Sequence, residues 1–384
     1  MIHVSRVTLG EVCTEYKGRV DDVGNLPIVG LEHLSQSDID LLGCSHEETT
    51  FTKGFLKGHV LFGRRRAYLK KASLAPFDGV CSGDIIVIEA KDGKLFPGLL
   101  PFIIQNDFLF DFAVENSAGS LSPRVKWKDL SRFEFDLPLM EEQEKLAELL
   151  WAAQETKRVY ARLLLACDEM VKSRFIEMFG DYESNEYGWP KETLEERIRF
   201  LTSGSRGWAK YYSDDGELFI TIKNVKGCKI SLDDIQHVMP PHEAEASRTR
   251  VQEGDLLVSV TADLGRTGVV SADLAKQSAY INQHLMLVRL DGAFYNPLFV
   301  AYFMESPFGK EQFAKKNMTG VKAGLNFDSM RSFRLFRPPI DLQNEFVEFV
   351  AQVDKSEFAL KQAIDSVSAT MTSILNQELG MSDV

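Results

Sequence analysis

Two long segments of the chain repeat apolar residues at alternating spacings of three and four, and they lie 200 positions apart. Each segment starts just after a proline, contains no internal proline or glycine, and ends at Gly180 or Gly380. This spacing is typical of a coiled-coil seam, and glycine suits the residue that ends a helix. We therefore expect two matched helices that pair through Leu146, Leu149, Ala153, Tyr160, Leu163, Met170, Phe346, Phe349, Val353, Leu360 and Val367.

The region before each helix has a different pattern. Short runs rich in Val, Ile, Leu and Phe alternate with turn residues, as at residues 85–88, 256–260 and 284–290, and a helical pattern covers 297–313. Such runs indicate strands of a mixed α/β domain. We expect an α+β chain with two α/β domains in tandem, each followed by a long helix. The helices would pair as an antiparallel coiled coil with pseudo-twofold symmetry, and the four segments would be 1–136, 137–180, 181–336 and 337–384.

The composition agrees with a folded chain of more than one domain. It has 384 residues, of which 44% are hydrophobic and 26% charged, and single cores stop growing near ~250 residues. No stretch is apolar for long enough to span a bilayer, and the first ten residues lack the apolar region of a signal peptide. We therefore expect a cytoplasmic protein without a membrane contact. The five cysteines are scattered without a CxxC pair, which favours reduced thiols over disulfides or a zinc site.

Charge is distributed unevenly along the chain. The net charge is −12, yet residues 49–77 contain seven Lys or Arg and no Asp or Glu. A solvated surface explains one such run, but arginine and lysine are also the residues that contact DNA phosphates and guanine. Polar loops at 118–124 and 318–324 occupy matched places in the two domains. Together these features predict DNA contacts by Arg64, Arg65, Arg66, Tyr68, Lys70, Lys71, Ser120, Ser122, Arg124, Arg248, Arg250, Arg266, Thr319 and Lys322.

Catalytic motifs match the sequence poorly. Asp84, Glu89 and Lys91 resemble the acids and lysine of a metal-dependent nuclease, but the second domain has His284 and Arg289 at the first two of these places. Residues 58–65 lack the Lys-Ser/Thr pair of a phosphate loop, and residues 337–340 lack the acceptor and aromatic with which a methyltransferase holds a flipped base. An enzyme with an unrecognised site, nuclease or methyltransferase, and a coiled-coil assembly protein without a DNA role remain as alternatives.

The entry into each long helix resembles that of a known family. Pro138 and Gln143 in the first copy, and Pro338 and Gln343 in the second, match the helix entry of the specificity subunits of type I restriction-modification systems. Leu342 departs from the family pattern, in which an acid such as Glu142 is usual. The resemblance covers essentially the whole chain and implies two target-recognition domains that read the halves of a bipartite DNA site.

The same resemblance implies that the chain is a non-catalytic scaffold. Its expected partners are double-stranded DNA, two adenine-N6 methyltransferase subunits and ATP-dependent restriction/translocase subunits. S-adenosylmethionine, ATP and Mg²⁺ would be bound by those partners, and this chain would hold no cofactor or metal. A helix of about 35 residues spans roughly 50 Å, enough to separate half-sites one DNA turn apart. Acidic residues on the helices suit docking by other proteins: Glu141, Glu144, Glu148, Glu345, Glu348 and Glu357.

Overall fold

The computed structural model describes residues 5–241, 244–317 and 324–381. The chain divides into two compact units, and each is described by itself. The first unit comprises Met1–Leu163 with Ala359–Val384, and the second comprises Leu164–Phe358. Each unit therefore takes one part of each long helix. The division into four segments expected from the sequence cuts the chain differently, and it stays a prediction.

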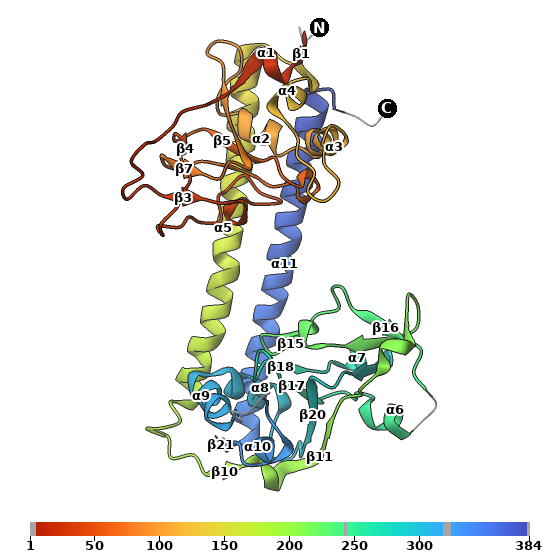
Figure 1. The fold of residues 1–384 in the computed structure, drawn as a ribbon. Coiled ribbons are helices and arrows are strands. Elements are labelled where there is room, and N and C mark those ends of the chain that lie inside the picture. The colour runs from red at the N-terminus through yellow and green to blue at the C-terminus, as the bar shows by residue number, and fades with distance from the viewer. Residues whose placement is uncertain (1–4, 242–243, 318–323, 382–384) are drawn as a thin grey trace. The chain divides into compact units, whose positions relative to one another are not determined.

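Two long helices close the two repeats, as the apolar spacing predicts. They are α5 (Met140–Phe179) and α11 (Ile340–Glu378), the yellow-green and blue coils of Figure 1. Gly180 and Gly380 follow them with φ angles of 75° and 59°. This left-handed conformation costs glycine little, which explains why both helices end there. The mixed helix and sheet content and the two long helices confirm the expected fold class.

Within each unit the two helices run antiparallel. In the first unit, Leu146 and Leu150 near the start of α5 share a core with Leu375 and Leu379 at the end of α11. In the second unit, the Phe175 ring near the end of α5 lies 5.3 Å from the Phe346 ring near the start of α11. The beginning of one helix therefore meets the end of the other in both units.

The buried seam corrects part of the sequence prediction. The stripe that contains Leu146 and Phe346 is buried as expected, but Leu149, Leu163 and Met170 are 51%, 46% and 47% exposed. The second stripe lies one residue later and includes the buried Leu150. Because apolar residues occupy adjacent positions here, periodicity alone cannot decide between the two registers. The remaining residues assigned to the seam are buried or partly buried: Ala153, Tyr160, Phe349, Val353, Leu360 and Val367.

The domain of the first unit is built on an antiparallel sheet with the order β2-β8-β5-β6. Ile86 and Ile88 belong to the core that includes α2 and both long helices, whereas Ile85 and Val87 belong to a second core around a three-stranded sheet, β3-β7-β4. Burial on both faces explains the continuous apolar run at 85–88. The elements are β1 (Ser5–Thr8), α1 (Leu9–Val12), β2 (Cys13–Glu15), β3 (Ile28–Val29), β4 (Lys53–Phe55), β5 (Val60–Gly63), β6 (Ala72–Leu74), β7 (Gly79–Cys81), β8 (Ile85–Ala90), α2 (Leu100–Ile104), α3 (Asp107–Glu115), α4 (Trp127–Leu130) and β9 (Glu134–Leu137).

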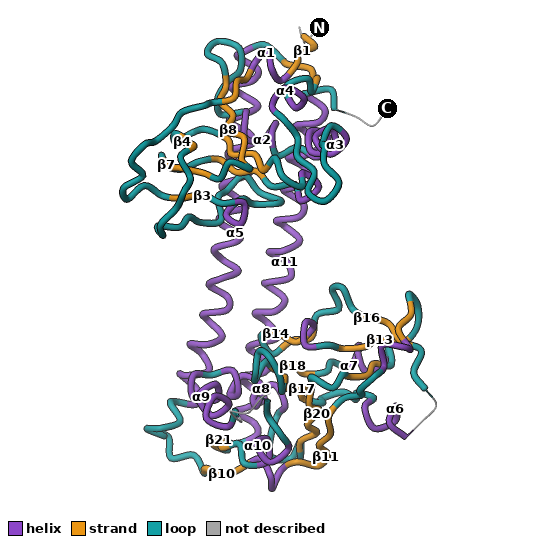
Figure 2. The backbone as a smooth tube through the Cα atoms, viewed as in Figure 1, coloured by secondary structure: helices purple, strands orange, loops and turns teal. Residues whose placement is uncertain are grey.

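The domain of the second unit repeats this plan with additions. Its sheet β11-β20-β17-β18 corresponds to β2-β8-β5-β6, and a second sheet has the order β12-β16-β13-β19 (strands orange in Figure 2). The helical pattern at 297–313 forms two helices, because Ser306 and Pro307 begin a new one. The elements are β10 (Lys191–Thr193), β11 (Ile198–Ser203), β12 (Tyr212–Ser213), β13 (Glu217–Ile220), β14 (Val225–Lys226), β15 (Lys229–Ile230), β16 (Gln236–Val238), α6 (Ala244–Thr249), β17 (Leu256–Ser259), β18 (Thr267–Val269), α7 (Ala272–Lys276), β19 (Ala279–Ile281), β20 (Leu285–Leu290), α8 (Pro297–Glu305), α9 (Pro307–Lys316), α10 (Phe327–Arg331) and β21 (Arg334–Phe336).

The glutamine of the repeated helix entry has the same task in both units. Gln143 donates from Nε2 to the Pro138 carbonyl (2.9 Å), and its Oε1 accepts from the Phe96 amide (2.8 Å). Gln343 makes the same bond to the Pro338 carbonyl (2.9 Å) and accepts from the Asn296 amide (2.9 Å). A buried amide that satisfies backbone groups on both sides fastens the helix start to its domain. The repeat recognised in the sequence is therefore also a repeat of structure.

Candidate nucleic-acid interface

Two basic segments far apart in the sequence lie side by side in the first unit. The chain leaves β5 at Gly63, and the carbonyl of the next residue, Arg64, accepts a hydrogen bond from the Val125 amide (3.0 Å). The Arg66 amide donates to the Pro123 carbonyl (2.8 Å), and Arg65 and Arg124 form an isolated β-bridge. The structure therefore brings the predicted arginines of residues 64–66 and the predicted polar loop at 118–124 into one cluster, which we call the arginine cluster.

Asp84 lies at the centre of the arginine cluster. Its carboxylate accepts from Nε (2.7 Å) and Nη2 (3.1 Å) of Arg124, and it forms an ion pair of 3.7 Å with Nη1 of Arg65. Hydrogen bonding by Arg124 holds the pKa of Asp84 below its ordinary value, with further contributions from the charges of Arg124, Arg65 and Arg64. Asp84 is therefore a carboxylate that orients two arginines at the surface.

The other members of the arginine cluster are held to different degrees. Nε of Arg65 donates to Oγ of Ser122 (2.7 Å), which links the two segments through side chains. Arg66 is exposed and has a left-handed backbone (φ 55°), and Ser120 is also exposed. Nε of Arg64 is buried and has no hydrogen-bond partner among the described residues. Arg66 and the outer part of Arg124 are thus the most accessible cations here.

Three further residues predicted to contact DNA lie outside the arginine cluster. Lys70 forms ion pairs with Asp107 (2.6 Å) and Asp111 (3.4 Å) of α3, so its charge is already compensated. Lys71 donates from Nζ to the Leu31 carbonyl (2.8 Å). Tyr68 is exposed, as a side chain that stacks on a base or sugar must be, but its ring has no aromatic or cationic neighbour among the described residues.

In the second unit the predicted arginines are not brought together. Arg248 donates to the Ser203 carbonyl (2.6 Å) and to Oγ1 of Thr202, whereas Arg250 donates to Oγ of Ser278 (2.5 Å). Arg266 pairs with Asp263, three residues before it. The other two predicted residues, Thr319 and Lys322, lie outside the described residues. The contacts given for these three arginines therefore lead to different partners and do not join them in one cluster.

The place equivalent to the arginine cluster can be found in the second unit from its backbone bonds. In the first unit, the Arg64 amide donates to the Asp84 carbonyl, and the Arg64 carbonyl accepts from the Val125 amide. In the second unit, the Val260 amide donates in the same way to the His284 carbonyl (3.0 Å), and the Val260 carbonyl accepts from the Leu325 amide (3.0 Å). The side chains there are Thr261, whose Oγ1 lies 2.7 Å from Nδ1 of His284, and Gln283. Sequence reasoning missed these residues, although the 200-residue repeat already aligns Asp84 with His284.

Open cavities lined by both basic and acidic residues lie near both places, with Glu15 among the lining residues of the first and Asp263 and Glu305 among those of the second. In the first unit a cavity of about 530 Å³ is lined by Lys17, Arg19, Lys53 and Gly83, the last of these next to Asp84 in the chain. In the second unit a cavity of about 520 Å³ is lined by residues of the 262–266 loop and of α9. Such grooves can admit a charged backbone or a base edge.

The three side chains of the nuclease-like pattern do not converge. Asp84 binds arginine, Glu89 lies 3.3 Å from Nε2 of His59, and Lys91 donates to the Gly10 carbonyl (2.6 Å). In the part of the chain that the structure describes, no group of three or more His, Cys, Asp or Glu residues could hold a metal ion. Burial raises the pKa of the Cys13 and Cys81 thiols to about 12, so neither is a thiolate nucleophile at neutral pH. No helix in the described ranges has the length and hydrophobicity needed to traverse a bilayer.

Comparisons with known proteins point to one family. Over 105 residues the chain is 31% identical to the EcoDI type I restriction enzyme specificity subunit of Escherichia coli, covering 27% of this chain and 23% of that protein. It is 22% identical over 169 residues to the EcoBI specificity subunit of the same species, covering 42% and 34%. The chain resembles type I specificity subunits. No protein-family model matches it.

Solved structures of type I subunits share the fold. A chain from a type I restriction-modification system, solved in a study of complex assembly and conformational transition, matches with a TM-score of 0.58 at 22% identity and covers 97% of this chain and 95% of its own. The S subunit from M. genitalium matches with a TM-score of 0.53 at 12% identity, covering 100% and 97%. These likenesses confirm the expected architecture. The sequence matches span only about a quarter and a third of the E. coli subunits.

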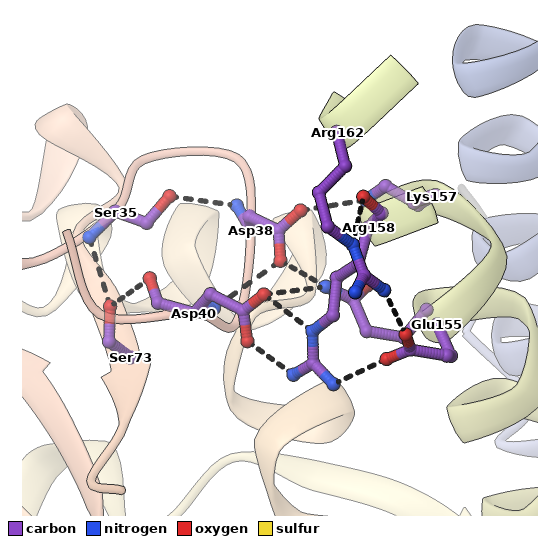
Figure 3. Close-up of polar contacts among 9 residues, drawn as sticks. Ser35, Asp38, Asp40, Ser73, Glu155, Lys157, Arg158 and Arg162 are labelled. Atoms are coloured by element: carbon purple, nitrogen blue, oxygen red, sulfur yellow. Dashed lines mark hydrogen bonds and ion pairs between the residues drawn. The ribbon is translucent and has the colours of Figure 1, made fainter. Parts of the chain in front are cut away.

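In this fold, ion pairs join each domain to its adjoining helix segment. In the first unit Asp38 pairs with Lys157 (3.0 Å) and Asp40 with Arg158 (2.5 Å), both helix residues of α5 (Figure 3). Hydrogen bonding from Arg158 holds the pKa of Asp40 below its ordinary value. In the second unit Lys229 pairs with Asp354 (2.6 Å) and Glu357 (3.0 Å) of α11. The helix contributes the cations in one unit and the anions in the other.

Proposed function

We propose that this chain is the DNA sequence-specificity subunit of a type I restriction-modification complex. Each of its two domains would read one half of a bipartite target, and the paired helices would act as the spacer. The observation that carries the proposal is the repetition of the same backbone bonds at Arg64 and Val260, in two domains that each lead into a matched helix. A duplicated reading site is what a split DNA target requires.

The charges of the described residues support DNA as the ligand. The arginine cluster presents Arg66 and Arg124 at the surface although the chain as a whole carries a net charge of −12. Arginine provides both the phosphate charge and the paired donors that guanine accepts. The acidic residues that lower the net charge include many on the long helices, which we do not expect to contact phosphate.

The long helices are also suited to protein partners. Their exposed residues include many acids and several large apolar side chains, Leu149, Leu163, Leu165, Met170, Ile176 and Phe358. Exposed apolar residues on helices are typical of surfaces that other proteins cover. We propose that two adenine-N6 methyltransferase subunits and the restriction/translocase subunits assemble here, in the cytoplasm. These partners would supply the catalytic residues and bind S-adenosylmethionine, ATP and Mg²⁺.

The first test is DNA binding by the full chain assembled with its methyltransferase partners. We expect binding to a duplex that contains the target to fall steeply with salt, by about 10³-fold or more between 50 and 200 mM for six or more phosphate contacts. Mapping methylated adenines in the host genome supplies the target sequence, and a duplex with a scrambled half-site is the matched control. Binding that ignores both salt and sequence would leave only the coiled-coil assembly alternative.

The second test separates the scaffold from an enzyme. The isolated chain is incubated with target duplex in the presence of Mg²⁺ and, separately, S-adenosylmethionine. We expect neither cleavage nor methyl transfer from the chain alone, and methyl transfer once the methyltransferase subunits are added. Turnover by the purified chain itself would contradict the proposal and favour an enzyme with a site that the sequence does not reveal.

A further inference from the structure

We propose that Arg124 reads a guanine in the half-site bound by the first unit, and that Asp84 is the positioning residue that presents Arg124 to it. The inference rests on the proposed function and goes further, because it names the reading residue and its base. It also assigns this guanine contact to the first unit alone.

The geometry around Arg124 leaves the correct edge of the guanidinium exposed. The carboxylate of Asp84 occupies the side edge, accepting from Nε at 2.7 Å and from Nη2 at 3.1 Å. Within the described part of the chain, the outer edge, formed by Nη1 and the second N–H of Nη2, makes only one long contact, from Nη1 to the Ser122 carbonyl at 3.5 Å. Two parallel donors on that edge match the O6 and N7 acceptors of guanine in the major groove.

Asp84 is itself fixed in place. Its amide donates to Oγ of Ser82 (3.2 Å), and the Ile85 amide donates to the Ser82 carbonyl (3.0 Å), so the carboxylate comes from a tight turn directly before β8. Arg65 adds a second ion pair, to Oδ2 of the carboxylate, and is held by Ser122. An arginine side chain that is already oriented loses less conformational freedom when it binds a base.

The arrangement also argues against Asp84 as a base reader. A carboxylate has about four acceptor positions, and an aspartate that reads cytosine must present one of them to the N4 amino group in a suitable direction. Both oxygens of Asp84 already accept from Arg124, and Oδ2 additionally faces Arg65. Asp84 therefore acts through the arginine.

The second unit cannot make the same contact. At the positions equivalent to Arg65 and Asp84, it has Thr261 and His284, which hydrogen-bond to each other. The residue before Leu325, equivalent to Arg124, is Gly324, whose added Cβ would lie 3.1 Å from the Val260 carbonyl oxygen. Among the residues that the structure describes, no long cation replaces Arg124 at this place, so we expect the guanine contact of Arg124 to have no counterpart in the second half-site.

The experiment uses the full chain with its methyltransferase partners and a pool of duplexes whose half-sites are randomised in turn. Bound duplexes are sequenced for the wild type and for Arg124→Lys, Asp84→Asn and Arg132→Lys. Arg124→Lys keeps the charge but loses the paired donors, so we expect guanine preference at one position of the first half-site to fall roughly 5- to 150-fold. Asp84→Asn removes one negative charge, so overall affinity should hold or rise while the same preference falls.

The second half-site and the Arg132→Lys control, which alters an exposed arginine outside the cluster, should match the wild type. Unchanged guanine preference in Arg124→Lys, or a fall in preference spread over both half-sites, overturns the assignment and leaves the Arg124–Asp84 contact as a surface ion pair. A wild-type complex that selects no sequence at all contradicts the proposed function instead. The two failures are therefore distinguishable.

Discussion

Single residues in this chain matter through the partners that the fold gives them. Asp84 and His59 illustrate this, because each is a common turn or strand residue by sequence. Asp84 becomes the centre of an arginine cluster, and His59 becomes a buried ring whose centroid lies 4.6 Å from that of Tyr16, with the two ring planes tilted by 55°. Nδ1 of His59 accepts from the Leu56 amide (3.2 Å), so the ring nitrogen near Glu89 carries the proton in the neutral form.

His59 predicts a pH dependence of stability. Burial lowers its pKa below the ordinary 6.5, although Glu89 and Asp78 act in the opposite direction. The unfolded chain therefore binds a proton more readily than the folded one, so the stabilisation is complete above pH 6.5 and decreases as the pH falls through the folded pKa. We expect urea unfolding at pH 7.5 and 5 to show this loss in the wild type and a smaller loss in His59→Gln. Exposed His46, changed to Gln, is the control, and an equal loss in both variants would contradict the assignment.

In each unit, an ion pair joins the domain to its long-helix segment, and the positive and negative partners are exchanged between the two units. Lys157 and Glu357 occupy the same place in the repeat, yet the first faces Asp38 and the second faces Lys229. A similar exchange occurs within the sheets, where His59 faces Glu89 in one unit and Asp255 faces Arg289 in the other. Each domain thus fits the charge of its own helix segment and would meet a like charge on the other.

The exchanged pairs can be tested in the second unit. Lys229→Glu places a third acid beside Asp354 and Glu357, and we expect it to destabilise the chain by on the order of 1 kcal/mol, as partly exposed pairs contribute little more. Hydrogen exchange should increase in β15, which contains this lysine, and in its partner strand β14. Adding Glu357→Lys should restore part of the loss, and a double variant no better than the single one would show that the pair is incidental.

The molecule as a whole depends on a seam that repeats every seven residues. Leu146, Ala153 and Tyr160 in α5, and Phe346, Val353 and Leu360 in α11, are buried or partly buried at this interval. Removing one heptad from each helix therefore preserves the seam while shortening each by about 10 Å at 1.5 Å per residue. If the helices are the spacer, as proposed, shorter helices should favour DNA targets with a shorter gap between the half-sites.

We expect a double deletion of 159–165 and 359–365 to shorten the preferred gap between half-sites without altering either half-sequence. The segments lie between the residues that fasten each domain, so Lys157 and Glu357 are kept. Methylation or binding assays on duplexes with graded gaps provide the measurement. The control is a variant in which exposed residues of the same segments, outside the helix-pairing seam, are substituted and none is deleted. An unchanged gap, or changed half-sequences, would contradict the spacer.

Much of the architecture follows from local sequence patterns. The two helices, their ends at Gly180 and Gly380, and the strands at 85–88 and 285–290 are all detectable because helix and strand periodicities are properties of short segments. The register of the seam between the helices could not be detected in this way, because Leu149 and Leu150 are equally apolar. Only packing against α11 and the first domain selects Leu150.

For the candidate site too, the sequence predicted some features and only the tertiary structure decided the others. The sequence alone determined that the chain has two similar domains, two matched helices and a basic run at 49–77, since these depend on residue type and spacing. Tertiary structure decided that Arg64–Arg66 meet the loop at 118–124, that Asp84 holds Arg124, and that Lys70 is compensated by α3. Side-chain partners come from segments distant in the chain, so their meeting depends on sheet pairing and turn geometry, which composition and periodicity do not specify.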